Sequence, residues 1–201
     1  MASRVGLDRR AVVQAAVAIV DRDGVEALTM ARLAATLGIR APSLYAHVSG
    51  QAGLRRELWL WTVTDLGDRL GQSVMGRSGR DALVAFATAL RDYGREFPGR
   101  YQLTLEPPVP FDDDAVAARR RANAPFKAVI RSFGLEGEDA VHIGRALRAA
   151  IHGFVGLEAR EALGAGTADE SFTHMLDLLA VGLSSRGVRD SEAYAAAAQP
   201  A

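Results

Sequence analysis

Apolar side chains recur at three- and four-residue intervals along most of this chain, which is the period of helices with one buried face. The first stripe runs from the candidate N-cap Asp8 to about Asp23 and stops at Gly24. Further stripes predict helices over residues 51–72, 80–97, 112–134, 138–162 and 169–185. No segment shows the alternation that predicts a strand, so the expected fold is all-α.

Two short helices joined by a tight turn are predicted between Thr29 and His47, in the stretch TMARLAATLGIRAPSLYAH. Thr29 is placed to cap the first of them, and Gly38 supplies the turn residue that tolerates positive φ. Pro42 suits the first turn of the second helix, because its fixed φ and missing N–H are harmless there. This is the spacing of a helix-turn-helix.

The second helix of this pair is expected to bury Leu44 and to leave a polar face outside. Outward hydroxyl, imidazole and guanidinium groups can donate to phosphates and base edges, and the major groove admits a helix. The alternative is an ordinary pair of short helices, but turn, small residue and polar face together favour DNA binding. The predicted DNA-contacting residues are Thr29, Arg40, Ala41, Pro42, Ser43, Tyr45 and His47.

Three of these residues keep two interpretations. Arg40 either reads guanine or neutralises a phosphate, with the phosphate slightly favoured. The ring of Tyr45 either faces DNA or packs in the core, and His47 either contacts DNA or caps its own helix.

Pro125 is expected to kink or divide the helix over 112–134, and residues 100–105 are predicted to be a short connecting segment. The helix over 138–162 carries Gly144, Gly153 and Gly156, which each cost about 0.5–1 kcal/mol relative to alanine. Close helix–helix contact is the simplest compensation for them.

The last predicted helix is apolar around more of its circumference than one core needs, which indicates a homodimer built from two helices of each protomer. The predicted interface residues are Ile151, Val155, Phe172, Met175, Leu176, Leu179 and Leu183. A small-molecule effector is expected in a cavity between the helices after residue 80. Its predicted walls and polar groups are Phe86, Leu90, Tyr93, Phe126, Ile130, Arg148, His152 and Phe154.

Composition narrows the class of protein. The 201 residues include 24 basic and 24 acidic side chains, yet residues 1–60 hold eight arginines against five acidic groups, which fits one DNA-facing end. The predicted domain order is a DNA-binding domain over 1–50, a connecting helix over 51–76, a ligand-binding and dimerisation domain over 77–186, and a disordered tail over 187–201.

Several classes of site are excluded or disfavoured. The chain has no cysteine, which rules out disulfides and thiolate chemistry, and its histidines form no compact cluster, so no metal or cofactor is expected. No enzyme motif is present, and the Glu158/Glu161 pair is interpreted as a surface feature. The apolar run at 11–20 is interrupted by Gln14 and is interpreted as a helix of a cytoplasmic protein, not as a signal peptide or membrane span.

The N-terminal ~60 residues resemble a TetR-type (tetracycline-repressor-like) transcriptional regulator. The resemblance rests on the threonine at 29, on Leu33-Ala34-Ala35-Thr36-Leu37-Gly38-Ile39, and on Leu44-Tyr45-Ala46-His47. A second segment, Ile151-His152-Gly153-Phe154-Val155-Gly156-Leu157-Glu158, is similar to the Trp-His-Gly segment of one subgroup's C-terminal domain. The resemblance implies a dimeric regulator, usually a repressor, that releases operator DNA when a small molecule binds.

Two positions depart from the family pattern. Val48 replaces a common phenylalanine, and Gln51 replaces a lysine that would contact phosphate. Arg40, Arg55 or Arg56 is the expected substitute for that lost charge.

The leading interpretation is therefore a dimeric repressor released from its operator by a small apolar or amphipathic effector. An activator or a ligand-independent regulator stays open, since the sequence does not separate them. From another class, a helical enzyme or a small-molecule carrier would lack selective affinity for DNA.

Overall fold

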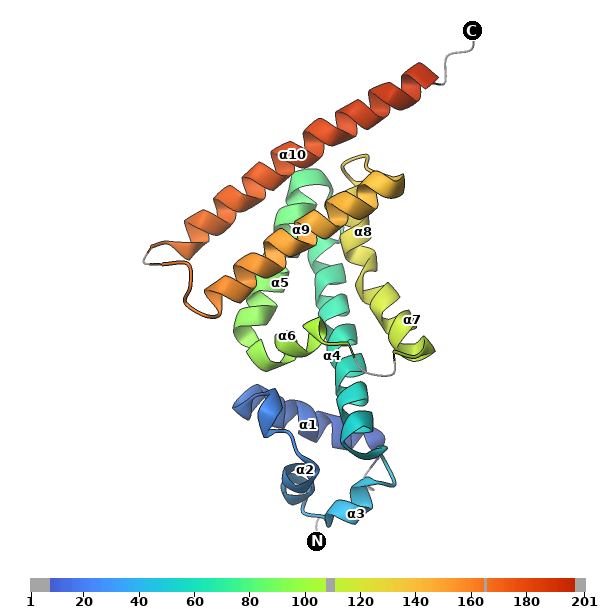
Figure 1. The fold of residues 1–201 in the computed structure, drawn as a ribbon, viewed down its shortest axis with the longest axis vertical. Helices are drawn as coiled ribbons and strands as arrows, with labels where there is room; N and C mark the ends of the chain where they lie inside the picture. The colour runs from blue at the N-terminus through green and yellow to red at the C-terminus, as the bar shows by residue number, and fades with distance from the viewer. Residues whose placement is uncertain (1–7, 108–110, 165, 198–201) are drawn as a thin grey trace. The chain divides into compact units, whose positions relative to one another are not determined.

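The computed structural model describes residues 8–107, 111–164 and 166–197. Within these ranges the chain is helical and contains no strand, which confirms the all-α prediction (Figure 1). In chain order the elements are α1 (Arg9–Asp23), the 3-10 turn η1 (Val25–Ala27), α2 (Met30–Leu37), α3 (Ala41–Leu44), α4 (Gly50–Val74), α5 (Gly79–Glu96), α6 (Pro98–Leu105), α7 (Asp113–Ala122), α8 (Ala124–Arg131), α9 (Gly137–Glu158) and α10 (Ala168–Ala197).

The chain folds into two compact units. The first comprises residues 1–66 and 96–121, and the second comprises 67–95 and 122–201. This division differs from the predicted linear one, because the segment 96–121 packs with the N-terminal unit. Helix α4 is continuous across the boundary, so its N-terminal part belongs to the first unit and its C-terminal part to the second.

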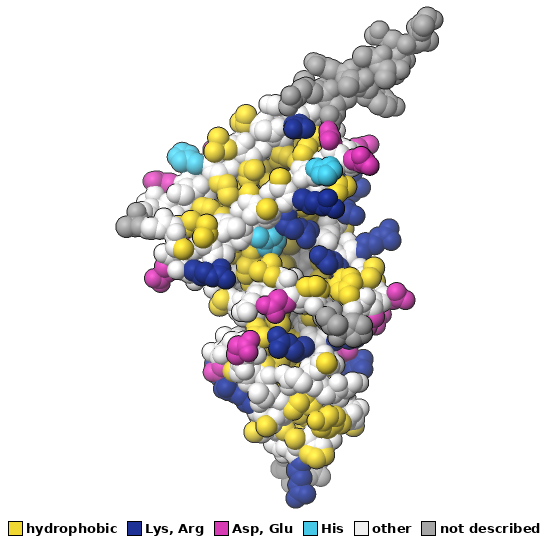
Figure 2. Space-filling view, viewed as in Figure 1, with side chains coloured by type: hydrophobic (Ala, Val, Ile, Leu, Met, Phe, Trp, Pro, Cys, Tyr) yellow, Lys and Arg dark blue, Asp and Glu magenta, His cyan; other side chains and the backbone are white. Residues whose placement is uncertain are grey.

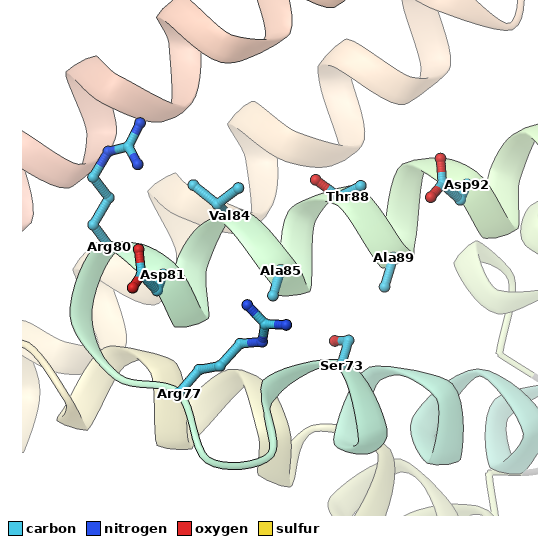
Figure 3. Close-up of a pocket in the computed structure, with 9 residues that line it drawn as sticks. All are labelled: Ser73, Arg77, Arg80, Asp81, Val84, Ala85, Thr88, Ala89 and Asp92. Carbon is cyan, nitrogen blue, oxygen red and sulfur yellow. The ribbon is translucent and has the colours of Figure 1, made fainter.

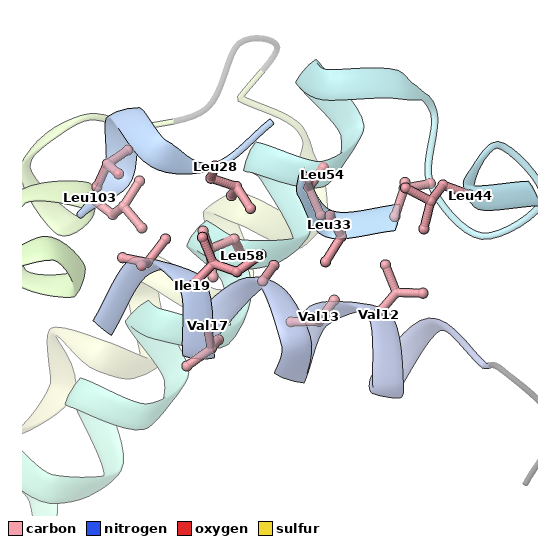
Figure 4. Packing of buried hydrophobic residues seen from close by; sticks show 14 of the residues in the cluster. Val12, Val13, Val17, Ile19, Leu28, Leu33, Leu44, Leu54, Leu58 and Leu103 are labelled. Atoms are coloured by element: carbon pink, nitrogen blue, oxygen red, sulfur yellow. The ribbon is translucent and has the colours of Figure 1, made fainter. Parts of the chain in front are cut away.

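The core of the first unit is formed by the stripes that the sequence predicts. Val12, Ile19, Leu33 and Leu44 are at most 1% exposed and meet in one cluster with side chains from the start of α4 (Figure 4). Burying each aliphatic side chain of this kind contributes roughly 1.5–3 kcal/mol relative to leaving it in water. The three short elements before α4 are therefore held mainly by α1 and α4.

Helix ends in this unit follow from single residues. Asp8 Oδ1 accepts a hydrogen bond from the Ala11 amide at 2.7 Å, and Thr29 Oγ1 accepts one from the Arg32 amide at 3.1 Å. Gly38 ends α2 with φ of 66°, a conformation that a β-carbon disfavours. These observations confirm the predicted caps and the turn between α2 and α3.

Helix α6 replaces the short connecting segment expected at 100–105. It begins at Pro98, which needs no N–H partner in the first turn, and lies against α1. Gly99 permits this approach, because a β-carbon there would come within 2.9 Å of Val20 Cγ1 and of its carbonyl oxygen. Arg100 then bonds both carboxylate oxygens of Asp21 and stacks 3.9 Å from the Phe97 ring centroid.

The helix expected over 112–134 is divided, as Pro125 predicts. Asp112 Oδ1 accepts from the Ala115 amide at 3.0 Å and caps α7, which ends at Ala122. Asn123 then precedes α8, whose first turn holds Pro125. The break allows α7 and α8 to follow different directions.

In the second unit α9 and α10 lie side by side (Figure 1). The predicted compensation for the α9 glycines holds for Gly144, where a β-carbon would lie 2.9 Å from Ile130 Cδ1. It does not hold within the chain for Gly153, which has open space beside it.

Helix α10 also continues to Ala197, where a frayed tail was expected after Arg186. Alanine has the highest intrinsic helix propensity, so the alanine-rich sequence favours continuation of the helix. The end of the predicted tail, residues 198–201, lies outside the described residues. In the part of the chain that the structure describes, each helix is too short or too polar to cross a membrane.

Candidate nucleic-acid interface

The predicted recognition helix is a short, rigidly anchored surface element. Pro42 lies in its first turn, and the completely buried Leu44 fixes it to the core. Regular helix ends at Leu44, but the amides of Tyr45 and His47 still bond the carbonyls three residues earlier, at 3.3 and 2.9 Å. The helical turn therefore extends to His47, as far as the sequence predicts.

Polar groups cover the outer face of this turn. Arg40, Pro42 and Ser43 are exposed, and the Tyr45 side chain is 63% exposed, so the alternative of a core tyrosine does not apply. Within the described residues the Arg40 side chain has no hydrogen bond or ion pair. These groups are available to a partner without breaking any contact in the protein.

Thr29, Ala41 and His47 border the same surface. Thr29 is exposed, and because its oxygen accepts the capping bond, its hydroxyl proton remains able to donate. Ala41 and His47 are half-buried, and the His47 carbonyl accepts a 3.5 Å hydrogen bond from Arg9. All seven predicted contact residues thus lie in or next to the turn unit, although no nucleic acid is present to test their roles.

The structure explains Gln51 and removes one of its expected substitutes. Gln51 Nε2 donates to the Leu28 carbonyl at 2.7 Å and so ties the start of α4 to the segment before α2. Arg56 is held by Asp112 at 2.6 Å and Asp114 at 2.8 Å, which raises its pKa and occupies its guanidinium. Arg56 is therefore not a free phosphate ligand, whereas Arg40 and the half-exposed Arg55 keep that role as candidates.

The predicted effector residues separate into two groups. Phe86 and Phe126 contact each other with ring centroids 5.2 Å apart, and Arg148 lies 5.3 Å from the Phe126 centroid while donating to Asn123 at 2.7 Å. Leu90, Tyr93 and Ile130 are also buried. Phe154 instead contacts Phe172 of α10 at 5.0 Å.

His152 is buried on α9, and this burial together with the nearby positive charge of Arg148 lowers its pKa from 6.5 to about 4. The imidazole is therefore neutral in the folded chain at neutral pH. Between these two pKa values the unfolded chain binds more protons than the folded one, so acidification favours unfolding.

We expect the free energy of unfolding to fall as the pH drops from 6.5 to about 4 through His152. The full contribution is roughly 3 kcal/mol, from 1.36 kcal/mol per pKa unit. Denaturant unfolding of wild type and His152→Gln at several pH values measures it. The difference between the two proteins should change across this range and stay constant above pH 7; a constant difference throughout would contradict the assignment.

A buried arginine joins three helices of the second unit. Arg91 of α5 is 5% exposed and bonds Glu158 of α9 at 2.5 Å and Asp169 of α10 at 2.7 Å. Its guanidinium also lies 4.5 Å from the Phe172 ring centroid. The hydrogen bond from Arg91 lowers the pKa of Glu158, which shows that Glu158 is not the surface residue expected from the sequence.

Sequence reasoning missed two polar groups on α4. The indole Nε1 of Trp59 and the hydroxyl of Thr62 are buried without a hydrogen-bond partner. A buried polar group left unpaired costs roughly 1–3 kcal/mol, so such groups are uncommon in folded proteins. The helical period indicates burial at both positions but does not show that a partner is lacking.

An open pocket of about 370 Å³ lies between the end of α4 and α5 (Figure 3). Its lining is Ser73, Arg77, Arg80, Asp81, Val84, Ala85, Thr88, Ala89 and Asp92. Arg80 is bound to Asp177 of α10, and the Arg77 guanidinium lies near Ala85 (Figure 3). Charges of both signs make it unlike the apolar cavity expected for an effector.

The predicted dimer residues are mostly occupied inside the chain. Ile151, Val155, Phe172, Leu176 and Leu183 are at most 5% exposed, and Met175 and Leu179 are half-buried. The exposed apolar side chains of α9 and α10 are instead Val141, Leu157, Leu178 and Val181, at 47–77%. Figure 2 shows hydrophobic side chains gathered over these helices. The surplus apolar surface exists, but on a different helix face from the predicted one.

Among the described residues, no group of three His, Cys, Asp or Glu side chains is arranged to hold a metal ion. The arrangement of the chain is thus a helix-turn-helix unit with a free polar face, and a helical unit with an apolar surface.

Comparisons with known proteins agree with this arrangement. The family described as "Tetracyclin repressor-like, C-terminal domain" matches residues 83–179. The helix-turn-helix-type transcriptional regulator Rv0681 of Mycobacterium tuberculosis is 38% identical over 181 residues, which cover 90% of this chain and 83% of that protein. The regulator YobS of Bacillus subtilis is 33% identical over 162 residues, covering 81% and 84%.

Solved structures share the fold. A Rhodococcus protein of unknown function superposes with a TM-score of 0.77 at 21% identity, covering 90% of this chain and 98% of its own. The Streptomyces coelicolor TetR family protein ActR, in complex with (S)-DNPA, gives 0.63 at 20% identity, covering 91% and 100%. The relatives named as regulators confirm that the chain is not an enzyme. The chain belongs to the TetR-type transcriptional regulators.

Proposed function

We propose that this protein is a dimeric repressor that binds operator DNA through α2 and α3 and leaves it when a small molecule binds the helical domain. The observation that carries the proposal is the free polar face of the α3 turn, anchored from behind by the buried Leu44. Phosphate contacts from Thr29 and Arg40 would fix register, and contacts from Ser43, Tyr45 and His47 would read bases. Such a protein acts in the cytoplasm, where its operator lies.

The dimer in this proposal uses the exposed apolar face of α9 and α10. Leu178 and Val181 are 77% and 67% exposed, which is a large apolar area for a surface helix. Gly153 and Gly182 have open space beside them, so a second backbone can approach these helices closely. Two copies of this face form a four-helix interface with twofold symmetry.

We expect Leu178→Glu combined with Val181→Glu to convert the dimer to a monomer, because the pair would place four like charges in one interface. Light scattering and sedimentation measure the mass. Thr173→Glu is a matched control, since Thr173 is exposed on the same helix outside this apolar set. A dimer that persists in the double variant would refute this interface.

The effector is supported by a fold relative. ActR, which shares the fold, has been solved with actinorhodin and with (S)-DNPA bound. We propose that this chain likewise binds a small apolar or amphipathic molecule. Ligand binding would shift the population toward an arrangement in which two DNA-binding units no longer fit half-sites one helical turn apart.

The test is release of DNA. A labelled fragment from the intergenic region beside the gene is bound at physiological salt, and compounds are screened for release with full-length protein. Compounds that release DNA while leaving the dimer intact support a ligand-responsive repressor. DNA binding that no ligand changes supports a ligand-independent regulator, whereas tight ligand binding without any selective DNA affinity supports a carrier.

A further inference from the structure

Two neighbouring groups on α4 lack the hydrogen bonds that their burial requires. Trp59 is 3% exposed and Thr62 is fully buried, yet neither the indole N–H nor the hydroxyl has a partner in the structure. An indole N–H is a donor only, so it can be satisfied only by an acceptor that comes from outside the described side chains. A hydroxyl both donates and accepts.

The two side chains share one face of α4. They are three residues apart, which places them next to each other on a helix. Val63 and Leu66, also buried, belong to the same side of the helix and make the surroundings apolar. A polar group in such surroundings gains more from a hydrogen bond than it would in water.

Aromatic and cationic groups complete this region within the first unit. The Trp59 ring meets Phe111 edge to face, with centroids 5.7 Å apart and planes at 79°. The Arg119 guanidinium lies 5.5 Å from the Phe111 centroid. Aromatic edges and faces of this kind suit a flat apolar molecule.

We propose that Trp59 and Thr62 are the hydrogen-bonding anchors of the effector site, and that the effector is a neutral, flat, apolar molecule with an acceptor oxygen such as a carbonyl. This inference rests on the proposed function and specifies the ligand class. The Trp59 N–H donates to the acceptor oxygen, and the Thr62 hydroxyl donates to the same oxygen or accepts from a neighbouring hydroxyl. A ligand of the same shape without the oxygen leaves both groups unpaired, which gives the site its selectivity.

A matched pair of probes tests this assignment on the full-length protein. 2-Acetonaphthone carries the carbonyl, and 2-isopropylnaphthalene has nearly the same shape without it. The chain has two tryptophans, so labelling with ¹⁵N-indole gives one Nε1–H resonance for Trp59 and one for Trp61. We expect 2-acetonaphthone to shift the Trp59 resonance downfield, the direction of a new hydrogen bond, and 2-isopropylnaphthalene not to do so.

Affinities supply the second readout. Trp59→Phe and Thr62→Val, which keep the shape of the side chains, should each weaken 2-acetonaphthone binding by about fivefold, the effect of one hydrogen bond. They should leave 2-isopropylnaphthalene unchanged. Trp61→Phe is the matched control, because Trp61 lies against Arg100 rather than in this region, and it should bind both probes as the wild type does.

Three results would overturn the assignment: equal binding of 2-acetonaphthone to Trp59→Phe and wild type, binding of neither probe at millimolar concentration, or a Trp59 resonance that contacts a long-lived water and ignores both probes. Operator binding is measured on the same samples. If the operator is bound but Trp59 does not respond, this inference fails and the proposed function stands. If Trp59 responds but no operator is bound selectively, the proposed function fails and the site remains.

Discussion

Arg91→Ala is expected to lower the free energy of unfolding by about 3 kcal/mol, the lower part of the range for removing one partner of a buried ion pair. The substitution leaves Glu158 with a 14% exposed side chain and only the more exposed Arg95 as a partner. It also removes the cation that contacts the Phe154 and Phe172 rings. Urea unfolding of the two proteins at neutral pH measures the difference.

Arg95→Ala is the matched control for this prediction. Arg95 bonds the same two carboxylates, at 2.8 and 3.2 Å, but its side chain is 48% exposed. Exposed ion pairs contribute about 0–1 kcal/mol because water screens them. Equal losses in the two variants would show that burial of Arg91 does not determine the stability of this junction.

The second large effect concerns DNA. We expect Arg40→Ala combined with Tyr45→Ala to weaken operator binding by about 100-fold, since each lost base or phosphate contact costs on the order of 1–3 kcal/mol. The salt dependence should also become shallower by about one unit in the logarithmic slope, because one cation is lost. Stability should hardly change, as both side chains are exposed.

Arg145→Ala controls for the general loss of positive charge, because Arg145 is exposed on α9, in the second unit. It should keep wild-type operator affinity in the same titration. If the double variant bound the operator as the wild type does, these two residues would have to be removed from the interface.

Local chemistry explains why the N-terminal unit could be predicted from the sequence. The caps at Asp8 and Thr29 and the left-handed turn at Gly38 each depend on residues within four positions of one another. The burial of Leu33 and Leu44 follows from the same short spacing. In such a unit the sequence pattern and the tertiary packing favour the same conformation.

Interactions between distant residues could not be predicted in this way. Arg91 and Glu158 are 67 positions apart, and Arg56 and Asp112 are 56 apart, so periodicity gives no sign that they meet. Without these partners, Glu158 was interpreted as a surface residue and Arg56 as free. The partners appear only when α5, α9 and the start of α7 are packed.

The dimer face shows a related limit. A helix that is apolar on two sides must bury one side within its own chain and the other against a partner, but periodicity does not say which is which. The structure places Phe172 and Leu176 inside and Leu178 and Val181 outside. Helix α6 was missed for a different reason, because Pro98 was interpreted only as a break although proline also suits a helix start.

The most direct test of the central claim is a footprint and titration of the full-length protein on the DNA that flanks its gene, at physiological salt. A DNA-binding regulator is expected to protect a sharp, twofold-symmetric site with a dissociation constant near 10⁻⁸ M or tighter, the order found for specific complexes. Binding at roughly 10⁻⁴ to 10⁻⁶ M that salt abolishes and that selects no site, here and on distant candidate operators, would contradict it.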